Sequence, residues 1–314
     1  MQPVAARLRW LIFALLLPGP AVAASCIGVI SAGGEVFWDQ VAAGARQAGE
    51  ELGVEIYFRG PIREGNVQTQ LQMIDWVVAR GCKALVIAPS GPAIGERVQA
   101  LKAQGVFTLF IDRDTGSQGV VAVIATDNYH AGRLAGQHLG ALLKGRGRVA
   151  LIRLNPEVIT TRERERGFVE AAEAAGLKIV FDRSLSEGHE QVIHALGKQL
   201  PALDALFTPN LVTTRAALVG LLHLKAAGSL THIGFDSDPL LLKALAQGQM
   251  AALVLQQPYA MGYRGVHLIQ QAVREQVVSP TAQQIELDVV MVTRERLSDP
   301  SIQQLLVAPA LERP

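Results

Sequence analysis

Short apolar runs alternate with helix-forming stretches along most of this chain, and this alternation restricts the fold more than any other feature. Apolar strand candidates begin near Cys26, Val54, Lys83, Val106, Val120, Arg148, Leu177, Ala205, Thr231, Ala251 and Ile285. Stretches rich in Ala, Leu, Gln, Glu and Arg lie between most of them. Repeated strand–helix–strand units build parallel sheets that helices cover on both faces. We therefore predict an α/β fold with doubly wound parallel sheets.

Several of the helical stretches end on a glycine directly before the next strand. These glycines are Gly53, Gly81, Gly105, Gly176 and Gly228. Glycine suits the left-handed residue that follows a helix end, because it has no Cβ atom to clash with the backbone. The glycines therefore mark the helix ends and support the prediction of βαβ units.

The units fall into two runs, residues 26–126 and 148–256. Asp127 and Asn128 lie between the runs and can cap a long helix over 128–144, and a further helix near 259–276 follows the second run. A chain of 314 residues is long enough for two domains. Because no Gly/Ser-rich or Pro-rich linker separates the runs, we expect two doubly wound lobes joined by a close-set hinge that the chain crosses more than once.

Two of the apolar runs end on an aspartate. The run 106–111 leads into Asp112 and Arg113, and the run 232–235 leads into Asp236. Uninterrupted apolar runs are typical of parallel strands that are buried on both faces. Ligands of open α/β sheets bind just beyond the carboxyl ends of such strands. We therefore expect one acid at the ligand-binding edge of each half, with a polar ligand held between them.

The N-terminus has the three parts of a secretory signal peptide. Arg7 and Arg9 precede a short apolar run over 10–17, and Ala21-Val22-Ala23 follows as a small-residue cleavage pattern. The apolar run is too short to span a bilayer as a helix, and an ordinary buried N-terminal helix is the alternative. We expect residues 1–25 to be a cleaved signal peptide, which places the mature protein in the periplasm.

Composition and charge argue against several functional classes. Hydrophobic residues make up 49% of the chain and charged residues 18%, which indicates sizeable cores rather than disorder. The formal net charge is +1 and no basic block occurs, so we expect no nucleic-acid partner. The phosphate-loop, dinucleotide, serine-hydrolase and zinc-protease motifs do not occur. We therefore predict that the protein is not an enzyme and has no cofactor or metal.

The chain has two cysteines, Cys26 at the start of the first strand and Cys82 at the start of the third. In the doubly wound strand order 2-1-3 these strands are neighbours, and both cysteines lie at the same edge of the sheet. In an exported protein this placement predicts a disulfide. The alternative is two small buried thiols whose side chains point apart.

A set of short segments resembles one known family. The segments are Ser31–Trp38, Leu85–Pro89, Phe110–Arg113, Ile124–Asn128, Ala131-Gly132, Ala135-Gly136, Arg162–Arg164, Phe207–Asn210, Ile233–Asp236 and Gln256–Pro258. In their order and spacing they resemble the type I periplasmic binding proteins, in particular the ribose-binding-protein group, over nearly the whole mature length. The same fold forms the effector domain of repressors of the lactose-repressor type, but here a signal sequence stands where those carry a helix-turn-helix.

The resemblance implies two lobes that close on a sugar and three chain segments that cross the hinge between them. It places the N-terminal lobe at 26–126 plus 257–284 and the C-terminal lobe at 127–256 plus 285–293. Residues 294–314 then form a C-terminal tail that is longer than the ribose group needs.

The resemblance nominates four ligand-binding residues in the first lobe. Phe37 and Trp38 match an aromatic pair that covers the apolar faces of a sugar ring, and packing into the core at a helix start is the alternative. Asp112 and Arg113 match a pair whose carboxylate accepts hydrogen bonds from hydroxyls and whose guanidinium donates to ring or hydroxyl oxygens. A solvated ion pair in a strand-end turn is the alternative.

In the second lobe and the hinge, the matching residues are Arg162, Asn210, Asp236 and Gln256. Arg162 lies in a stretch of alternating charges that also suits a solvated helix face, and Thr160 with Glu163 also fits a capping box. Asn210 and Asp236 also suit the N-caps of the helices that follow them. Hinge geometry is the alternative explanation for Gln256.

The chain departs from the ribose pattern at Glu35 and Ala88, where the ribose binder has asparagines, and it has no clear second-lobe aromatic. The predicted site then holds three acids, Glu35, Asp112 and Asp236, against two bases. An excess carboxylate is costly to bury unpaired. Either Glu35 faces solvent at the rim of the cleft, or the ligand brings a positive or strongly donating group. These departures weaken the case for ribose and leave a polyhydroxylated ligand as the best class.

The function we predict is a monomeric periplasmic solute-binding protein. It captures a sugar or related polyhydroxylated ligand and delivers it to an inner-membrane ABC permease for import. The main alternative is a sensory protein with the same fold, whose closed form signals to a membrane histidine kinase or a chemoreceptor. An exported hydrolase on this fold is a third alternative.

Overall fold

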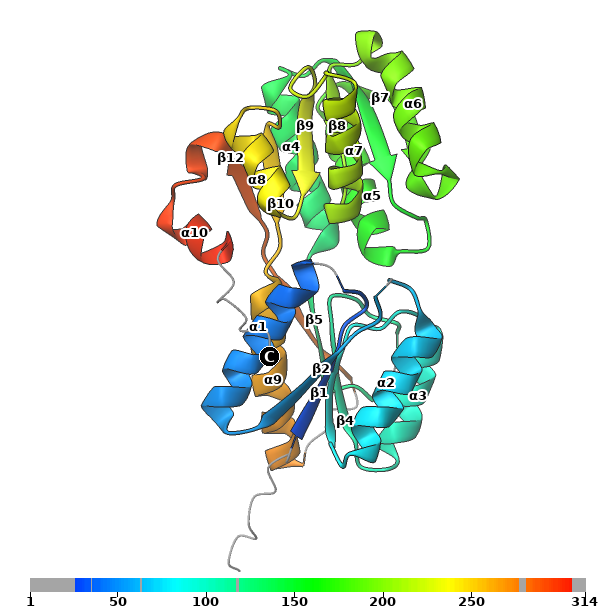
Figure 1. Ribbon diagram of the computed structural model, residues 1–314, viewed down its shortest axis with the longest axis vertical. Helices are drawn as coiled ribbons and strands as arrows, with labels where there is room; N and C mark the ends of the chain where they lie inside the picture. Colours follow the sequence, from blue (N-terminus) through cyan, green and yellow to red (C-terminus); the bar gives the residue numbers. More distant parts are fainter. Residues whose placement is uncertain (1–25, 35, 63, 117–118, 277–280, 307–314) are drawn as a thin grey trace, which may run out of the picture.

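The computed structural model describes residues 26–34, 36–62, 64–116, 119–276 and 281–306. Within these ranges the chain forms two lobes, one above the other along the long axis of the molecule, and each lobe is built on a six-stranded sheet (Figure 1). The α/β fold class and the two doubly wound lobes are confirmed. The predicted signal peptide lies outside the described residues, as does Glu35.

The first sheet has the strand order β11-β5-β4-β3-β1-β2, and all its strand pairs are parallel. Its strands are β1 (Cys26–Ile30), β2 (Glu55–Arg59), β3 (Ala84–Ile87), β4 (Phe107–Ile111), β5 (Ala122–Thr126) and β11 (Gln283–Leu287). The predicted order 2-1-3 of the first three strands is therefore confirmed.

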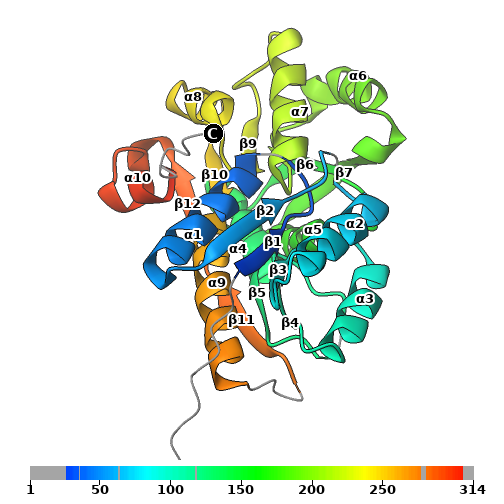
Figure 2. The same ribbon diagram turned by 60° about the horizontal axis from the view of Figure 1, so that its bottom comes forward.

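Helices cover both faces of the first sheet (Figure 2). Helices α1 (Val36–Leu52) and α9 (Pro258–Glu275) pack on one face, and α2 (Val67–Ala79) and α3 (Pro92–Lys102) pack on the other. Successive strand residues point to opposite faces, so β1 contributes Val29 to the first core and Ile30 to the second. This two-sided burial explains why the strands are apolar without interruption.

The second sheet has the order β12-β10-β9-β8-β6-β7, in which only the pair of β10 and β12 is antiparallel. Its strands are β6 (Gly147–Arg153), β7 (Leu177–Ser184), β8 (Ala205–Phe207), β9 (Thr231–Phe235), β10 (Ala252–Leu255) and β12 (Val290–Thr293). The position of the predicted strand near Thr231, which leads into Asp236, is confirmed by β9.

Helices cover both faces of the second sheet as well. Helices α4 (Asn128–Leu142) and α5 (Ile159–Ala174) pack on one face, and α6 (His189–Gln199), α7 (Leu211–His223) and α8 (Pro239–Ala246) pack on the other. Part of the predicted tail is ordered as the short helix α10 (Pro300–Leu306), whose Ile302 is buried in the cluster around α8. Short 3₁₀ helices occupy Leu185–Glu187, Leu200–Ala202 and Arg294–Arg296.

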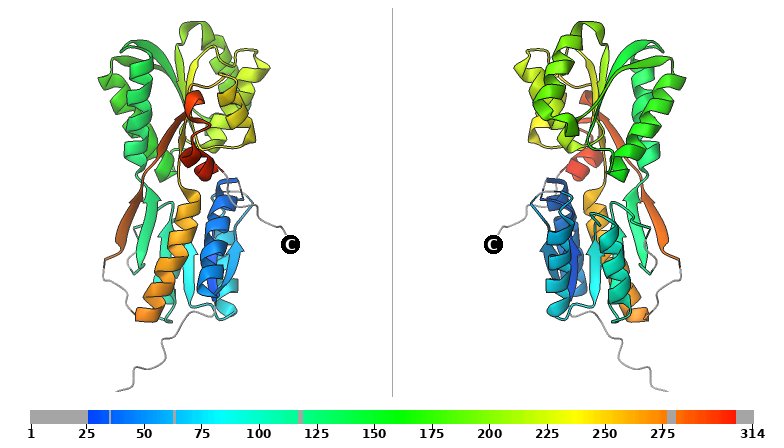
Figure 3. Two further views of the ribbon diagram at one scale, coloured as in Figure 1. Left: turned by 90° about the vertical axis from the view of Figure 1, so that its left-hand side faces the viewer. Right: turned by 90° about the vertical axis from the view of Figure 1, so that its right-hand side faces the viewer.

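The chain crosses between the lobes at three places: between β5 and α4, between β10 and α9, and between β11 and β12. In Figure 3, β11 and β12 follow one another from the first lobe into the second. We predicted one final strand from Ile285 in the second lobe, whereas Ile285 pairs with Ile124 in the first sheet and only β12 belongs to the second. Apolar residues lie on both sides of Asp288 in the crossing, so the pattern did not reveal where one strand ends and the next begins.

The helix-end glycines have the conformation that their positions predicted. Gly53, Gly81, Gly105, Gly176 and Gly228 all have φ between 64° and 88°. Only glycine reaches this region without a steric cost from Cβ.

Among the described helices, none combines the length and the apolar character that a membrane span needs.

The predicted disulfide is confirmed: Cys26 and Cys82 are bonded, with their Cα atoms 5.0 Å apart. The bond joins residues that are 56 positions apart in the sequence and ties β1 to the residues that lead into β3. A disulfide that closes a loop of this many residues restricts the unfolded chain much more than the folded one.

We expect the double variant C26A/C82A to lose about 4 kcal/mol of unfolding free energy, because the unfolded chain regains the loop entropy. Denaturant unfolding of the oxidised protein and of the variant measures the difference. Dithiothreitol should lower the stability of the native protein and leave that of the variant unchanged. Equal stability of the oxidised and reduced native protein would contradict the prediction.

Candidate ligand-binding site

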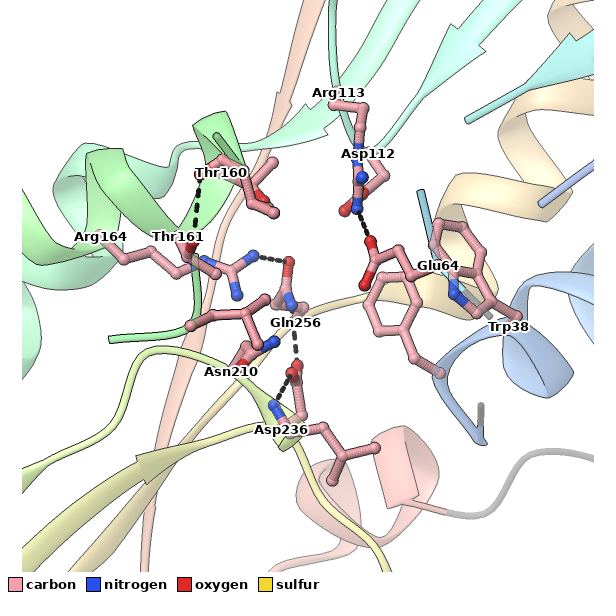
Figure 4. A pocket seen from close by; sticks show the side chains of 14 residues that line it. Trp38, Glu64, Asp112, Arg113, Thr160, Thr161, Arg164, Asn210, Asp236 and Gln256 are labelled. Atoms are coloured by element: carbon pink, nitrogen blue, oxygen red, sulfur yellow. Dashed lines mark hydrogen bonds and ion pairs between the residues drawn. The ribbon is translucent and has the colours of Figure 1, made fainter. Parts of the chain in front are cut away.

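A pocket lies between the two lobes, at the carboxyl ends of the parallel strands (Figure 4). The first lobe contributes Phe37, Trp38, Glu64, Asp112 and Arg113. The second lobe and the second crossing contribute Leu154, Val158, Thr160, Thr161, Arg164, Asn210, Leu211, Asp236 and Gln256. The empty space between the lining atoms amounts to about 410 Å³, part of it open to solvent.

The two strand-end aspartates occupy equivalent positions in the two lobes. Asp112 follows β4 with φ 66°, and Asp236 follows β9 with φ 62°. In each case the backbone N–H donates to the neighbouring strand, to Ile124 O and Val254 O respectively, at 2.9 Å. Aspartate is one of the few residues besides glycine that tolerate this left-handed conformation. The turn directs both carboxylates to the edge of the sheet, where both line the pocket.

Arg113 lies between two carboxylates in the first lobe. Its Nε donates to Asp112 Oδ2 at 2.9 Å, and its Nη2 donates to Glu64 Oε1. Burial opposes the charge of Arg113, but the negative charges of Asp112 and Glu64 outweigh it and raise the pKa of Arg113 above its ordinary value. The guanidinium is therefore permanently charged and fixed in place by the protein.

Arg164 is the buried cation of the second lobe. Its Nε donates to Asn128 Oδ1 at 2.8 Å, and its Nη1 donates to Pro209 O at 2.9 Å. Its Nη2 donates to Gln256 Oε1 at 2.6 Å, and the guanidinium lies 4.7 Å from the centre of the Phe235 ring. Burial lowers the pKa of Arg164, against the opposing attraction of Asp236.

Asp236 is buried and fully held by hydrogen bonds. Its Oδ2 accepts from Leu211 N at 3.0 Å, and its Oδ1 accepts from Gln256 Nε2 at 2.8 Å. Burial raises the pKa of Asp236, although Arg164 and these hydrogen bonds act in the opposite direction. Gln256 also accepts from Thr126 Oγ1 at 2.9 Å, so its amide joins the first crossing to both charged groups of the second lobe.

The aromatic pair at the start of α1 lies on the first-lobe side. The rings of Phe37 and Trp38 meet edge to face with centroids 4.9 Å apart. Trp38 is buried in the core under α1, whereas Phe37 is half-buried. Both residues line the pocket, so Phe37 has the greater apolar surface to offer a ligand.

Asn210 combines its place in the pocket with the alternative role as a helix cap. It is the N-cap of α7, where its Oδ1 accepts from Thr213 N at 3.0 Å. A buried network supports the loop behind it: Thr214 Oγ1 donates to Asn210 O at 2.7 Å and contacts Thr208 Oγ1 at 3.0 Å. The N-cap of α8 is Asp238, so the capping alternative for Asp236 is wrong.

The arginine that we predicted for the second lobe is displaced by two residues. Arg162 is exposed and lines a wider outer cavity, whereas Arg164 is buried and lines the pocket. On a helix, residues two apart point to nearly opposite sides, and the alternating charges did not reveal which side faces inward. The N-cap of α5 is Val158, which makes no side-chain capping hydrogen bond. Thr160 therefore does not cap α5; it lies in the first turn of this helix and lines the pocket.

Glu64 is a charged pocket residue that the sequence did not suggest. It lies in the loop between β2 and α2, away from any strand end or motif. Its proximity to Arg113 arises only because the loop folds over the end of β4. Within the described ranges, no group of three or more His, Cys, Asp or Glu side chains is arranged to hold a metal ion.

Comparison with known proteins identifies similar chains over most of the length. The family described as periplasmic binding protein domain matches residues 27–276. A ribose import binding protein of Haemophilus influenzae is 27% identical over 228 residues, which cover 71% of this chain and 76% of that protein. The D-ribose/D-allose-binding protein of Pseudomonas aeruginosa is 26% identical over 63% of this chain and 65% of its own length.

Solved structures show the same arrangement of lobes. A carbohydrate transporter solute binding protein of Agrobacterium radiobacter, in complex with D-arabinose, has a TM-score of 0.80 and 29% identity. The alignment covers 91% of this chain and 99% of that one. An ABC transporter solute binding protein of Agrobacterium vitis with bound D-fucose has a TM-score of 0.78 and 26% identity, over 88% of this chain and 98% of that one.

We expect His232, which lies under the Asn210 loop, to make the fold sensitive to acid. Its Nε2 contacts Thr208 Oγ1 at 2.9 Å, and burial lowers its pKa from 6.5 to about 3. Between these values the unfolded chain binds a proton that the folded protein does not, so stability falls as pH falls from about 6.5 towards 3.

Between pH 7 and pH 5 this histidine should cost about 2 kcal/mol of unfolding free energy. Denaturant unfolding of the native protein and of H232Q at both pH values measures the contribution, because glutamine keeps a polar partner for Thr208 and does not titrate. Equal losses in the two proteins would contradict the assignment.

Proposed function

This chain belongs to the family of periplasmic binding protein domains, and on that premise we propose that it captures a sugar between its two lobes. The bound, closed form would then deliver the sugar to an inner-membrane ABC importer. The proposal includes export to the periplasm and action as a monomer, without chemical change of the ligand. The relatives include a ribose import binding protein and a D-ribose/D-allose-binding protein, which supports a sugar as the ligand class.

One observation carries the proposal: hydrogen-bonding groups of both lobes converge on one pocket at the carboxyl ends of two parallel sheets. Asp112 and Arg113 approach from the first lobe, and Arg164 and Asp236 approach from the second. A sugar hydroxyl donates one hydrogen bond and accepts others, so it can bridge a carboxylate and an amide or guanidinium group. A ligand that satisfies both lobes at once favours their closure.

The apolar side of the pocket supports the same ligand class. Phe37, Leu154, Val158 and Leu211 line it together with the polar groups. A sugar ring has C–H faces that pack on such side chains while its rim of hydroxyls faces the polar ones. The second lobe thus offers aliphatic side chains, whereas the first offers an aromatic one.

The geometry of the hinge supports closure of the two lobes around the ligand. Three chain crossings connect the lobes, and the Gln256–Thr126 hydrogen bond joins two of them. Short crossings of this kind restrict the lobes to rotation about the hinge and prevent independent tumbling. The closed form would be the species that the importer recognises.

The first test is binding of neutral monosaccharides, namely D-ribose, D-allose, D-arabinose and D-fucose, to the protein without residues 1–25. A true ligand at a hundred times its dissociation constant should add about 2.7 kcal/mol of stability, which thermal unfolding and calorimetry detect. D112N should weaken binding about 10- to 150-fold, because a hydrogen bond to a charged group is worth about 1.5–3 kcal/mol.

Asparagine also tolerates the left-handed conformation of residue 112, so this variant should keep its fold. The matched control is D75N, which removes a surface carboxylate that pairs with Arg97 outside the pocket. Equal affinities of D112N and D75N would contradict the role of Asp112, and a wider sugar panel without any binding would contradict the proposed function.

A second prediction concerns the packing that holds Arg164. At Gly132 of α4, an added Cβ would lie 1.9 Å from the backbone oxygen of Arg164 on α5. G132A must therefore push α5 away and shift the guanidinium, and we expect about 10- to 100-fold weaker sugar binding from a displacement of this order. Calorimetric titration measures the loss.

The matched control for G132A is G140A, two turns further along α4, where an added Cβ would meet Ala175 instead. We expect G140A to reduce stability and to leave affinity within a few-fold. In an R164K background G132A should have little further effect on affinity. A full additional loss there would show that Gly132 does not act through Arg164.

A further inference from the structure

The charged side chains that the described residues bring to the pocket do not balance. Among these residues three carboxylates line it, those of Glu64, Asp112 and Asp236, against two guanidinium groups. The sequence alone had already predicted three acids, with Glu35 as the third, but Glu35 lies outside the described residues and Glu64 supplies a third acid. A buried negative charge without a counter-charge is costly. A ligand that completes the balance would carry a positive charge.

The protein itself uses about half of the N–H donors that the two arginines could offer a ligand. All three nitrogens of Arg164 donate to protein oxygens: Nε to Asn128, Nη1 to Pro209 and Nη2 to Gln256. In Arg113, Nε and Nη2 donate to Asp112 and Glu64. These hydrogen bonds fix both guanidinium groups in place, so each arginine holds the pocket together and has fewer N–H groups left for a ligand.

Acceptors of the first lobe are also available. The side chain of Asp112 is only 6% exposed, and it uses Oδ2 towards Arg113. Among the hydrogen bonds between described residues, none reaches its Oδ1, although the residue lines the pocket. Glu64 is bonded to Arg113 through Oε1, and no hydrogen bond between described residues reaches its Oε2. The first-lobe side of the pocket thus offers two carboxylate oxygens, one of Asp112 and one of Glu64, that accept no hydrogen bond from a described residue.

Glu64 stands where the pocket opens into the outer cavity. It lines both spaces, together with Arg113, Leu154 and Val158. Its side chain is 22% exposed, compared with 13% for Arg113. A group on the ligand that faces this opening would meet Glu64 first, and closure of the lobes would remove water from that contact and strengthen it.

We propose that the ligand is a sugar or sugar-like polyol that carries a protonated amine, and that Glu64 is the residue that selects for it. The proposal rests on the proposed sugar-binding function and refines it. The hydroxyls of the ligand occupy the site between Asp112, Asn210 and Asp236, and the ammonium group lies against the Glu64 carboxylate. The ammonium group restores the charge balance of the pocket and has only donors, which match the free acceptors.

The test compares matched pairs of neutral and amino sugars. The probes are D-glucose and D-galactose, the same sugars with an amine at carbon 1, 2, 3 or 6, and their N-acetyl forms, which keep the bulk and lose the charge. Calorimetry measures each affinity. We expect at least one amine to bind tenfold or more tightly than its parent sugar, and its N-acetyl form to lose that gain.

The variant E64Q keeps the size of the side chain and removes the charge. It should reduce the preference for the amine at least tenfold and change affinity for the neutral parent much less. The matched control is E157Q, which removes a carboxylate of the outer cavity that does not line the pocket, and its preference should equal that of the native protein. Circular dichroism of both variants confirms that the fold is kept.

The possible outcomes distinguish a failure of the amine preference from a failure of the proposed sugar-binding function. If neutral sugars bind as tightly as every amine, or if E64Q leaves the amine preference unchanged, then the inference is wrong and sugar binding stands. In that case Glu64 serves only to hold Arg113. If neither the neutral sugars nor the amines bind, then the proposed sugar-binding function fails, and the inference fails with it.

Discussion

The amide of Gln256 is the interaction on which the rest of the site depends. It lies at the second crossing, where it accepts from Thr126 of the first crossing and from Arg164, and donates to Asp236. A buried arginine and a buried aspartate are both expensive to remove from water. One amide group satisfies both, because it offers an acceptor to the cation and a donor to the anion. The same group therefore stabilises the charged site and the hinge beside it.

The two lobes use the same backbone geometry for different chemistry. In each lobe an aspartate follows a buried strand in a left-handed conformation and reaches the sheet edge. Asp112 then meets Arg113 and belongs to an ion-pair cluster with Glu64. Asp236 instead meets an amide N–H and the Gln256 side chain. The first lobe thus presents a charged side to the pocket, and the second presents a rigid hydrogen-bonded one.

Close helix packing links the fold to the site in the second lobe. Gly132 lets α4 approach the backbone of Arg164, and Asn128 at the start of the same helix accepts from its guanidinium. The position of the buried cation is therefore set by the packing of α4 against α5, the helix whose first turns line the pocket. A similar contact occurs in the first lobe, where an added Cβ on Gly44 of α1 would meet Tyr259 of α9.

The sequence by itself determined the α/β class, the two lobes and most of the strand positions, because strand burial and helix-end glycines are local patterns of single chain segments. From the predicted strand order it also indicated the Cys26–Cys82 bond. It also placed Asp112 and Asp236 at the sheet edge, since both follow buried strands. Tertiary structure alone decided that Arg164 rather than Arg162 faces the pocket, that the third crossing follows Leu287, and that Glu64 joins Arg113. These features depend on the rotation of a helix, the pairing partner of a strand and the path of a loop. Contacts between distant segments fix all three, and no local pattern records such contacts.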